Sequence, residues 1–419
     1  MRSSCMPSIG PAPPPRTCAT DLEARWASAT ALVAGARDVL DARLLDGVPP
    51  PALVARGWDA SLLALEDDEL ERIEAIGLAA RWPTRTPPTL SELLEHARAV
   101  TDVPVLGGPG AASGPLRARE TPRKHAQVEA LVGAVAPLVA RAGRVVDVGA
   151  GHGHLTRAIA ALLAVPAVGV DRDGARVDRA RSLVRADAGD RASFVVRDVL
   201  REGLAIAPGD CVLGLHACGE LGDVLVEAAS AVGAAVALVG CCLQKRRQPV
   251  RAPLCPVGEH GAALDLPRPL LGLANLSMRD EGVEASRAEN LVARERRVAL
   301  RRLLSLEGHA LGPGEEIGGL NRRAAHGPLD ALVARAFARR ALPAPSARAI
   351  DEAGRWAREH HGRMRRLSLP RALLGRALET WVALDRARRL AIDGYEVKVG
   401  TAFDASVSAR NLAILATRS

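Results

Sequence analysis

From residue 121 onward, short apolar runs alternate with stretches in which apolar residues recur every three or four positions. Strands that alternate with helices predict a parallel sheet with right-handed crossovers, and runs that are apolar throughout are typical of strands buried on both faces. Two later runs are close enough along the chain to pair antiparallel. The predicted strands are residues 144–150, 166–171, 193–198, 210–219, 234–242, 395–403 and 411–418. We therefore predict an α/β, Rossmann-like sheet of seven strands.

The chain before this sheet has a different pattern. Residues 1–20 are rich in Pro and Ser and predict a disordered tail. Residues 21–100 have helical spacing and predict a helical N-terminal domain, and the Gly- and Pro-rich residues 101–120 predict a linker.

The stretch between the fifth and sixth predicted strands is long. Residues 243–285 look irregular, and arginine-rich helices are expected over residues 286–340. Two more helices are predicted at residues 347–366 and 370–391. The resulting division is a core at 121–285, a helical insertion at 286–366, and a last helix and strand pair at 367–419.

Composition narrows the function classes. The 419 residues are 48% hydrophobic and 25% charged, which excludes disorder of the whole chain. Five Trp, three Phe and one Tyr are too few for a sheet that stacks RNA bases on rows of rings. The first residues lack the apolar core of a signal peptide, and no apolar run reaches about 18 residues. We expect a cytoplasmic protein with reduced thiols and no membrane partner.

The basic residues are concentrated in one segment. The net charge is +8, yet residues 286–391 hold 22 Arg and 11 acidic residues, so this segment carries +11 and the remainder −3. Such a segment favours a polyanionic partner. A solvated helical bundle with arginines on its outer faces fits the same pattern.

The clearest chemical signal follows the first predicted strand. The sequence there reads Asp147-Val-Gly149-Ala-Gly151-His-Gly153 and leads into a helix. Glycines permit a tight turn and a close approach of ligand to backbone, and the first turn of a helix offers free N–H groups.

Acidic residues end the next two predicted strands. Asp171 is placed to accept hydrogen bonds from both hydroxyls of a ribose, and Asp198 is placed to reach an adenine amine. The Gly-x-Gly-x-Gly spacing and the terminal strand pair resemble class I S-adenosylmethionine (SAM) methyltransferases. The resemblance implies SAM as cofactor, with Gly149–Gly153 beside its methionine part, Asp171 on the ribose and Asp198 near the adenine. Asp147 completes this predicted cofactor set.

The ends of the fourth and fifth predicted strands carry a second cluster. His216 and Cys218 follow the fourth strand, and Cys241, Cys242 and Lys245 follow the fifth. The ligand crevice of an open α/β sheet lies at the carboxyl ends of its strands, so these side chains should converge.

Four interpretations of this cluster are open. His216 acts as general base or orients the substrate, with Cys218 beside it. Alternatively a cysteine is a covalent nucleophile, as in RNA cytosine-5 methyltransferases, whose Pro-Cys and Thr-Cys contexts are absent here. In a third interpretation, the cluster binds zinc together with Cys255 or His260. Finally, the cysteines are small buried hydrophobes. We favour the first interpretation and assign no metal.

The helix before the first strand adds candidate substrate contacts. Lys124 and His125 lie in RKHAQVEA, and a helix in this place passes over the SAM pocket. Lys124 and Lys245 are two of only three lysines, which suggests a need for a compact ammonium group or reflects chance. The predicted substrate contacts are Lys124, His125, Cys241, Cys242 and Lys245.

The motifs RKHAQVEA, DVGAGHGHL, GLHACGEL, VGCC and FDASVSARNLAILA, in this order, resemble the methyltransferase-like protein 25 family and its bacterial relatives. The resemblance covers about residues 121–250 and 367–419. A similar His-x-Cys-Gly motif in the tRNA 2′-O-methyltransferase of the acceptor stem implies RNA as substrate. Departures from the family motifs, which bear on the substrate and not on SAM, are Arg123, Ala126, Glu220, Leu243, Ala405 and Ala409.

The sequence thus predicts a SAM-dependent methyltransferase that acts on an oxygen or nitrogen atom of RNA, either tRNA or rRNA, gripped by residues 286–391. Catalysis would be mostly positioning. Two alternatives are a protein methyltransferase that docks an acidic protein on the same arginines, and a non-catalytic SAM-fold protein that binds RNA or a ribosomal subunit.

Overall fold

The structure is a computed structural model. It describes residues 19–42, 44, 47–107, 120–187, 189–255, 264–275, 286–312 and 314–418. Most of the predicted tail and most of the predicted linker lie outside these residues. The described part of the linker lies against the sheet edge, where the Leu106 N–H donates to the Thr401 carbonyl at 2.8 Å.

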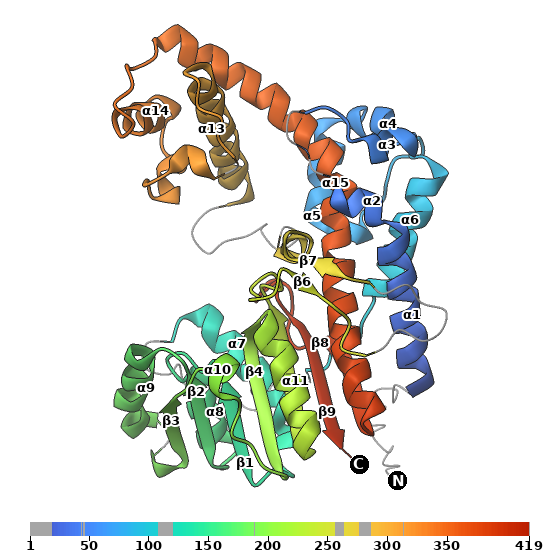
Figure 1. Cartoon of the computed structure of the whole chain (residues 1–419), viewed down its shortest axis with the longest axis vertical. Helices are drawn as coiled ribbons and strands as arrows, with labels where there is room; N and C mark the ends of the chain where they lie inside the picture. The colour runs from blue at the N-terminus through green and yellow to red at the C-terminus, as the bar shows by residue number, and fades with distance from the viewer. Residues whose placement is uncertain are drawn as a thin grey trace, which may run out of the picture.

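Seven strands form one sheet in the order β3-β2-β1-β4-β5-β9-β8 (Figure 1). β1 to β5 are parallel, and β9 pairs antiparallel with both β5 and β8. The strands are β1 (Arg144–Val148), β2 (Ala167–Asp171), β3 (Ala192–Val196), β4 (Asp210–Cys218), β5 (Ala235–Cys241), β8 (Tyr395–Thr401) and β9 (Leu412–Arg418). The predicted seven-stranded α/β sheet is confirmed. The strand order reverses between β1 and β4, which is where such sheets bind ligands.

Helices cover both faces of the sheet, which explains why its strands are apolar throughout. Val145 of β1 packs with α7 (Pro122–Val139) and α8 (His154–Leu162). Its neighbour Val146 belongs to the core on the other face, which contains α11 (Glu220–Val232) and the C-terminal half of α15 (Ala347–Ile392). The remaining helices around the sheet are α9 (Gly174–Asp187) and α10 (Val199–Glu202).

α15 is one continuous helix of 46 residues, so the prediction of two helices at 347–366 and 370–391 is wrong. Pro370 lies inside it and removes one backbone hydrogen bond. Leu367, Leu369 and Leu374 are buried around the proline, and this packing keeps the helix continuous. The predicted boundary between residues 366 and 367 therefore lies within a single helix.

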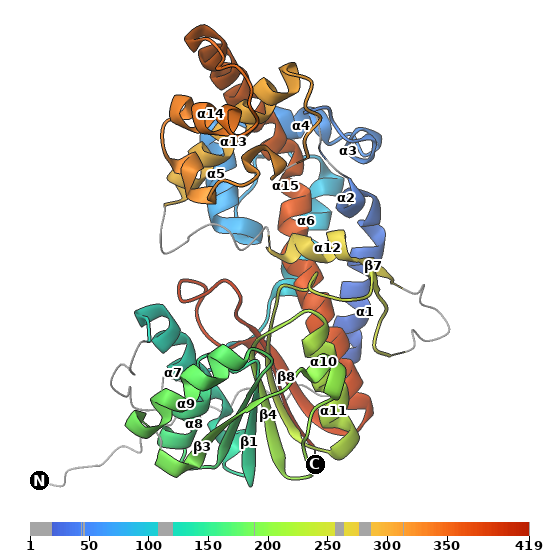
Figure 2. The same cartoon turned by 60° about the vertical axis from the view of Figure 1, so that its left-hand side comes forward.

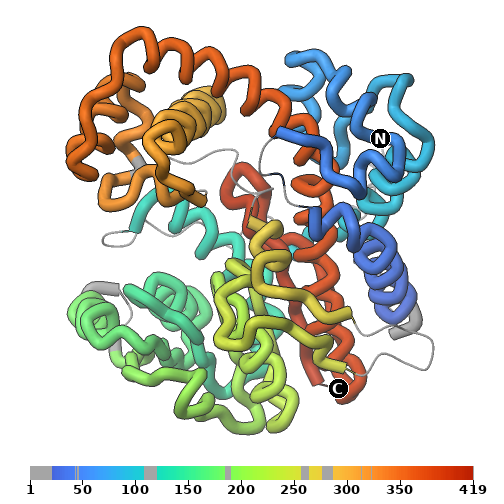
Figure 3. Tube along the Cα trace, turned by 45° about the horizontal axis from the view of Figure 1, so that its top comes forward, coloured from blue at the N-terminus to red at the C-terminus, as the bar shows by residue number. Residues whose placement is uncertain are grey.

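α15 also joins the helical parts of the molecule. Figure 2 shows it running from the block formed by α13 (Arg287–Leu306) and α14 (Leu329–Ala338), past the N-terminal helices, to the sheet. The N-terminal helices share the core on which the C-terminal half of α15 packs, whereas α13 and α14 form a separate small core with the N-terminal end of α15. Figure 3 shows these two groups on either side of α15. The N-terminal helices are α1 (Ala19–Gly35), α2 (Arg37–Asp41), α3 (Pro51–Ala55), α4 (Asp59–Leu63), α5 (Asp67–Ile76) and α6 (Pro88–Thr101).

The segment after β5 is short of regular structure, as expected for residues 243–285. Its described part holds a two-stranded ribbon of β6 (Val250–Arg251) and β7 (Leu266–Pro267), followed by α12 (Arg268–Leu271). No helix in the described part of the chain is both long enough and apolar enough to span a membrane.

The arginine-rich segment is partly neutralised within the molecule. Residues 21–100 hold 14 acidic and 8 basic residues. Arg287 and Arg365 both bind Glu74 at 2.7 Å, and Arg366 binds Asp67 at 2.7 Å. Some arginines of residues 286–391 therefore pair with acidic residues of the N-terminal helices and not with an external partner.

Candidate functional site

The glycine loop between β1 and α8 has the conformation that only glycine adopts easily. Gly149, Gly151 and Gly153 have φ of 77°, 56° and 72°. A Cβ on Gly153 would lie 2.3 Å from the Phe194 ring, whereas a Cβ on Gly151 would meet nothing within 4 Å. Gly153 caps α8 without a side chain, so no capping side chain occupies the first N–H groups of the helix. The loop therefore offers open space beside a helix N-terminus.

Asp171 lies buried at the end of β2 and faces this loop. Its Oδ2 accepts a hydrogen bond from the Gly151 N–H at 2.8 Å, and its Oδ1 accepts one from the Asp173 N–H at 3.0 Å. A carboxylate has about four acceptor positions, so two remain for a pair of ribose hydroxyls. The geometry fits the contact predicted for Asp171.

Asp147 is buried at the end of β1, where Thr156 of α8 donates to its Oδ2 at 2.7 Å. Burial raises the pKa of Asp147 to about 6, and the Thr156 hydroxyl and the Lys124 ammonium oppose that rise. Burial lowers the pKa of Lys124, while Asp147 and Glu120 raise it. Lys124 thus lies near the loop, and Asp147 fixes the loop to α8.

The two other predicted contacts at this end have local partners. Asp198 lies two residues beyond β3 and caps α10, accepting a hydrogen bond from the Leu200 N–H at 3.1 Å. His125 lies 3.0 Å from Glu120 through its Nδ1. Their contacts with adenine and with substrate stay predictions.

His216 forms an irregularity in β4, where the pairing with β5 shifts between Leu215 and Ala217. Its φ of 68° is unusual for a residue other than glycine. The ring Nε2 lies 3.2 Å from the Gln127 side-chain oxygen of α7, and the buried Nδ1 has no hydrogen-bond partner among the described residues. The bulge thus turns the imidazole toward α7.

The environment of His216 changes its expected chemistry. Burial, followed by the charges of Lys124, Arg410 and Arg123, lowers the pKa of His216 to about 4. The ring is therefore neutral at pH 7 and a weaker base than the unperturbed value near 6.5 suggests. With Nε2–H donated to the Gln127 oxygen, Nδ1 is left as a hydrogen-bond acceptor that is unpaired within the described part of the chain.

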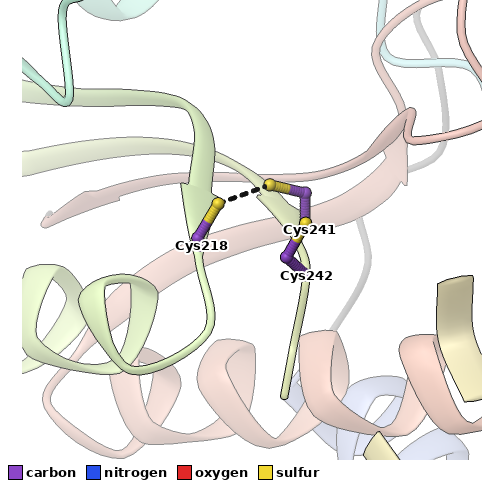
Figure 4. A group of neighbouring side chains, drawn as sticks. All are labelled: Cys218, Cys241 and Cys242. Carbon is purple, nitrogen blue, oxygen red and sulfur yellow. Dashed lines mark hydrogen bonds between the residues drawn. The ribbon is translucent and has the colours of Figure 1, made fainter. Parts of the chain in front are cut away.

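Three cysteine sulfurs meet at the ends of β4 and β5 (Figure 4). The Sγ atoms of Cys218 and Cys241 are 3.1 Å apart, and those of Cys218, Cys241 and Cys242 all lie within 4.8 Å of one another. Lys245 Nζ is 3.9 Å from Cys218 Sγ, and Arg410 Nη1 is 3.2 Å from Cys242 Sγ. The Cys241 thiol, then Lys245, lowers the pKa of Cys218 to about 6, while the interaction with Cys218 raises the pKa of Cys241.

The structure thus brings the predicted cluster at the ends of β4 and β5 together. Cys255 is buried elsewhere, near Asp385 and Arg388 of α15, and His260 lies outside the described residues. Sequence reasoning missed Gln127 and Arg410. Gln127 follows Lys124 by three residues and so shares its helix face, and this spacing was an available signal. Arg410 lies in the closing motif, but its contact with Cys242 depends on the fold.

A cavity of about 980 Å³ lies between the N-terminal helices, α13, α15 and the loop joining β8 to β9. Its floor includes Ala409 and Asn411, which flank Arg410. The charged residues that line it are Glu74, Arg98, Asp102, Arg287, Arg294, Arg365, Arg371 and Arg376. Six arginines and two acidic residues give its wall an excess of positive charge.

A protein family described as a methyltransferase domain matches residues 123–248. This segment contains the glycine loop, Asp171, His216 and the three cysteines. The chain therefore contains a methyltransferase domain, and its cofactor is S-adenosylmethionine.

Three solved structures illustrate what parts of the chain are similar to. CcbJ from Streptomyces caelestis is 19% identical over 33% of this chain and 59% of its own, with a TM-score of 0.24. TrmN from Thermus thermophilus is 22% identical over 33% of this chain and 46% of its own, with a TM-score of 0.23. A TehB-like SAM-dependent methyltransferase from Corynebacterium glutamicum is 14% identical over 32% of this chain and 86% of its own, with a TM-score of 0.21. The chain spans about half the length of the first two. Likeness at this level carries no information on the substrate.

Proposed function

We propose that this protein is a SAM-dependent methyltransferase that methylates an oxygen or nitrogen atom of RNA, either tRNA or rRNA. The match to a methyltransferase domain and the glycine loop support the reaction class. The observation that carries the substrate class is the arginine-lined cavity. The His216-x-Cys218-Gly219 motif and the resemblance to the methyltransferase-like protein 25 family support the same proposal. The proposal places the reaction in the cytoplasm, where the thiols stay reduced.

The cavity has the chemistry of a phosphate-binding surface. The side chains of Arg98 and Arg294 make no hydrogen bond or ion pair with other described residues, so we propose that their charges bind the ligand. None of the lining residues is Phe, Tyr or Trp, which favours contacts with the backbone phosphates over base stacking. Ala409 and Asn411 line the cavity, and Arg410 between them donates toward Cys242, so the proposal has a strand held in the cavity extend toward the ends of β4 and β5.

The residues of the site divide into cofactor and substrate groups. Gly149, Gly151 and Asp171 would hold SAM, which when bound supplies an electrophilic methyl group on sulfur. The neutral His216 accepts a hydrogen bond from the substrate O–H or N–H through Nδ1, and Gln127 fixes the ring orientation. His216 thereby directs a lone pair of the nucleophile, and catalysis rests mainly on positioning.

The test uses purified protein, SAM with a tritiated methyl group, and extract from a strain that lacks the gene. We expect label in high-molecular-weight material that nuclease releases and protease does not. Label that protease releases would replace RNA with a protein substrate. No label in either fraction, with SAM binding demonstrated separately, would contradict catalysis.

Cavity variants test the route of binding. The double variant Arg98→Ala/Arg294→Ala should raise the KM for the RNA about tenfold. The slope of the logarithm of the RNA-binding constant against the logarithm of salt concentration should become shallower by about two. Its affinity for SAM should stay unchanged. Arg348→Ala is the matched control, because that side chain is 88% exposed on α15 and lies outside the cavity. Equal effects of both variants would contradict binding in the cavity.

A further inference from the structure

We propose that Cys218, Cys241 and Cys242 bind one zinc ion through their three sulfur atoms and leave its fourth position open. The three side chains form the only group of three or more His, Cys, Asp and Glu residues with metal-binding proximity in the described part of the chain. Neither the methyltransferase domain match nor SAM binding requires a metal, so the proposal is independent of the reaction proposed above.

The sulfur positions agree with zinc geometry. A zinc–sulfur bond is about 2.3 Å long, and tetrahedral angles then place two sulfurs ~3.8 Å apart. The Cys218 and Cys241 sulfurs are 3.1 Å apart, and the largest separation in the group is within 4.8 Å. The required spacing lies inside this range, so small side-chain rotations are enough to bind the ion.

The backbone is shaped to bring these sulfurs together. Successive residues of a regular strand point to opposite faces, so Cys241 and Cys242 would separate if β5 continued. Instead β5 ends at Cys241, and Cys242 has a φ of 43°, which is unfavourable for a residue with a side chain. Both sulfurs then reach Cys218, whose Cα pairs with that of Cys241 across the two strands (Figure 4).

The surroundings suit thiolates and not packed hydrophobes. Lys245 lies beside Cys218, and Arg410 donates toward Cys242, so two cations offset the negative charge of three thiolates. Cys211, at the start of β4, shows the alternative. It is fully buried in an apolar core, and burial raises its pKa to about 12. Cys218 and Cys242 are partly exposed at the ligand end of the sheet.

The donor set selects the metal and its role. Thiolates are soft ligands that favour zinc over magnesium or calcium, which take oxygen ligands. No fourth protein ligand joins the three cysteines among the described residues. Structural zinc sites are closed by four protein ligands, whereas catalytic sites keep an open position. A site of this type is suited to hold a substrate atom or a water at the ends of β4 and β5.

The experiment measures zinc in the full-length protein purified under reducing conditions, followed by replacement with cobalt. We expect about one zinc per chain and a cobalt derivative with sulfur-to-metal charge-transfer absorption and the intense visible bands of tetrahedral coordination. Cys218→Ser, Cys241→Ser and Cys242→Ser should each weaken metal binding at least tenfold. Cys211→Ser is the matched control and should bind metal as the parent does.

A second measurement uses the unmodified chain and so does not depend on the folding of variants. Zinc should protect Cys218, Cys241 and Cys242 from alkylation, and a chelator should restore their reactivity, as read by mass spectrometry of each peptide. The proposal is overturned if the reduced protein binds no zinc, if cobalt shows no sulfur charge transfer, or if alkylation of these cysteines is the same with and without zinc.

Discussion

At the scale of single residues, burial decides what His216 can do. Its ring lies against Gln127 and near the cations Lys124 and Arg410, so the neutral form is strongly favoured. A histidine in water titrates near 6.5, which made general-base catalysis attractive from the sequence. In the structure the ring is neutral at about pH 7, and the proposed role is therefore to accept a hydrogen bond and orient the nucleophile.

A substitution and a pH profile test this role. His216→Asn should lower kcat by about 100-fold or more, with SAM affinity unchanged. Asn is the suitable replacement because it tolerates the positive φ at this position. In the parent enzyme, the active neutral ring persists until the pH falls toward about 4, so kcat/KM should show no inflection near 6.5.

The measurement is the steady-state rate between about pH 5.5 and 8, roughly the range in which histidine normally titrates. Calorimetry measures the affinity for SAM. An inflection near the ordinary histidine value that disappears in His216→Asn would contradict the orienting role and restore general-base catalysis.

At the scale of elements, α15 is fastened to the sheet by buried charges. Asp223 of α11 accepts hydrogen bonds from Arg386 of α15 at 2.8 Å and from Arg251 of β6 at 3.1 Å. Arg251 also donates to Asp385 of α15 at 2.7 Å. All four side chains are buried. The same helix carries the cavity wall, so this network also positions the cavity relative to β4.

Removal of one charge should destabilise this junction. In Asp223→Asn, the buried arginines lose their shared counter-charge, and the free energy of unfolding should fall by about 3–5 kcal/mol. Urea denaturation followed by circular dichroism measures the change. Asp178→Asn is the control, because Asp178 pairs with Arg181 on the surface and its side chain is 73% exposed. Its effect should stay below about 1 kcal/mol. If Asp223→Asn lowered the free energy of unfolding no more than Asp178→Asn does, the network would not be needed for stability.

At the scale of the whole molecule, acidic N-terminal helices and arginine-rich helices meet along α15. Arg388 forms an ion pair with Glu23 at 2.8 Å, and both Arg287 and Arg365 form ion pairs with Glu74. Charge complementarity between distant segments thus holds the helical layers together. Arg287 and Arg365 also line the cavity, together with four other arginines.

Buried histidines make the stability of the molecule dependent on pH. Burial is the main cause that lowers the pKa of His154, His216 and His361 to about 4 each. Unfolding returns these groups to about 6.5, so the unfolded chain binds more protons between about 6.5 and 4. Stability should therefore fall as the pH falls through this window.

Asp147 opposes this trend, because burial raises its pKa to about 6 in the folded protein. Protonation of Asp147 therefore stabilises the folded protein as the pH falls through that value. Burial also raises the pKa of Glu295 and Glu379, which oppose the trend in the same way. The three histidines bind protons in the unfolded chain already at about pH 6.5 and outweigh these carboxyls, so the Tm should be lower at about pH 5 than at about pH 7. Scanning calorimetry at both values measures the difference. An equal or higher Tm at the lower pH would contradict the prediction. His361→Gln should weaken the pH dependence, because it removes one of the three groups.

The sequence by itself determined the strands, the glycine loop and the place of the cysteine cluster. Apolar runs and helical spacing are local signals, and residues 144–148 and 167–171 formed strands where the pattern predicted them. His216 and Cys241 converge because the carboxyl ends of neighbouring parallel strands meet at one edge of a sheet. These features follow from residues near one another in the chain or from the regular geometry of the sheet.

Only the tertiary structure decided the protonation of His216, the continuity of α15 through Pro370, and the pairing of arginines with acidic helices. Each depends on groups that are distant in sequence. Arg410 reaches Cys242 across 168 positions, and Arg365 reaches Glu74 across 291. Desolvation and ion pairing arise from what surrounds a side chain in space, and a pattern of neighbouring residues does not contain that information.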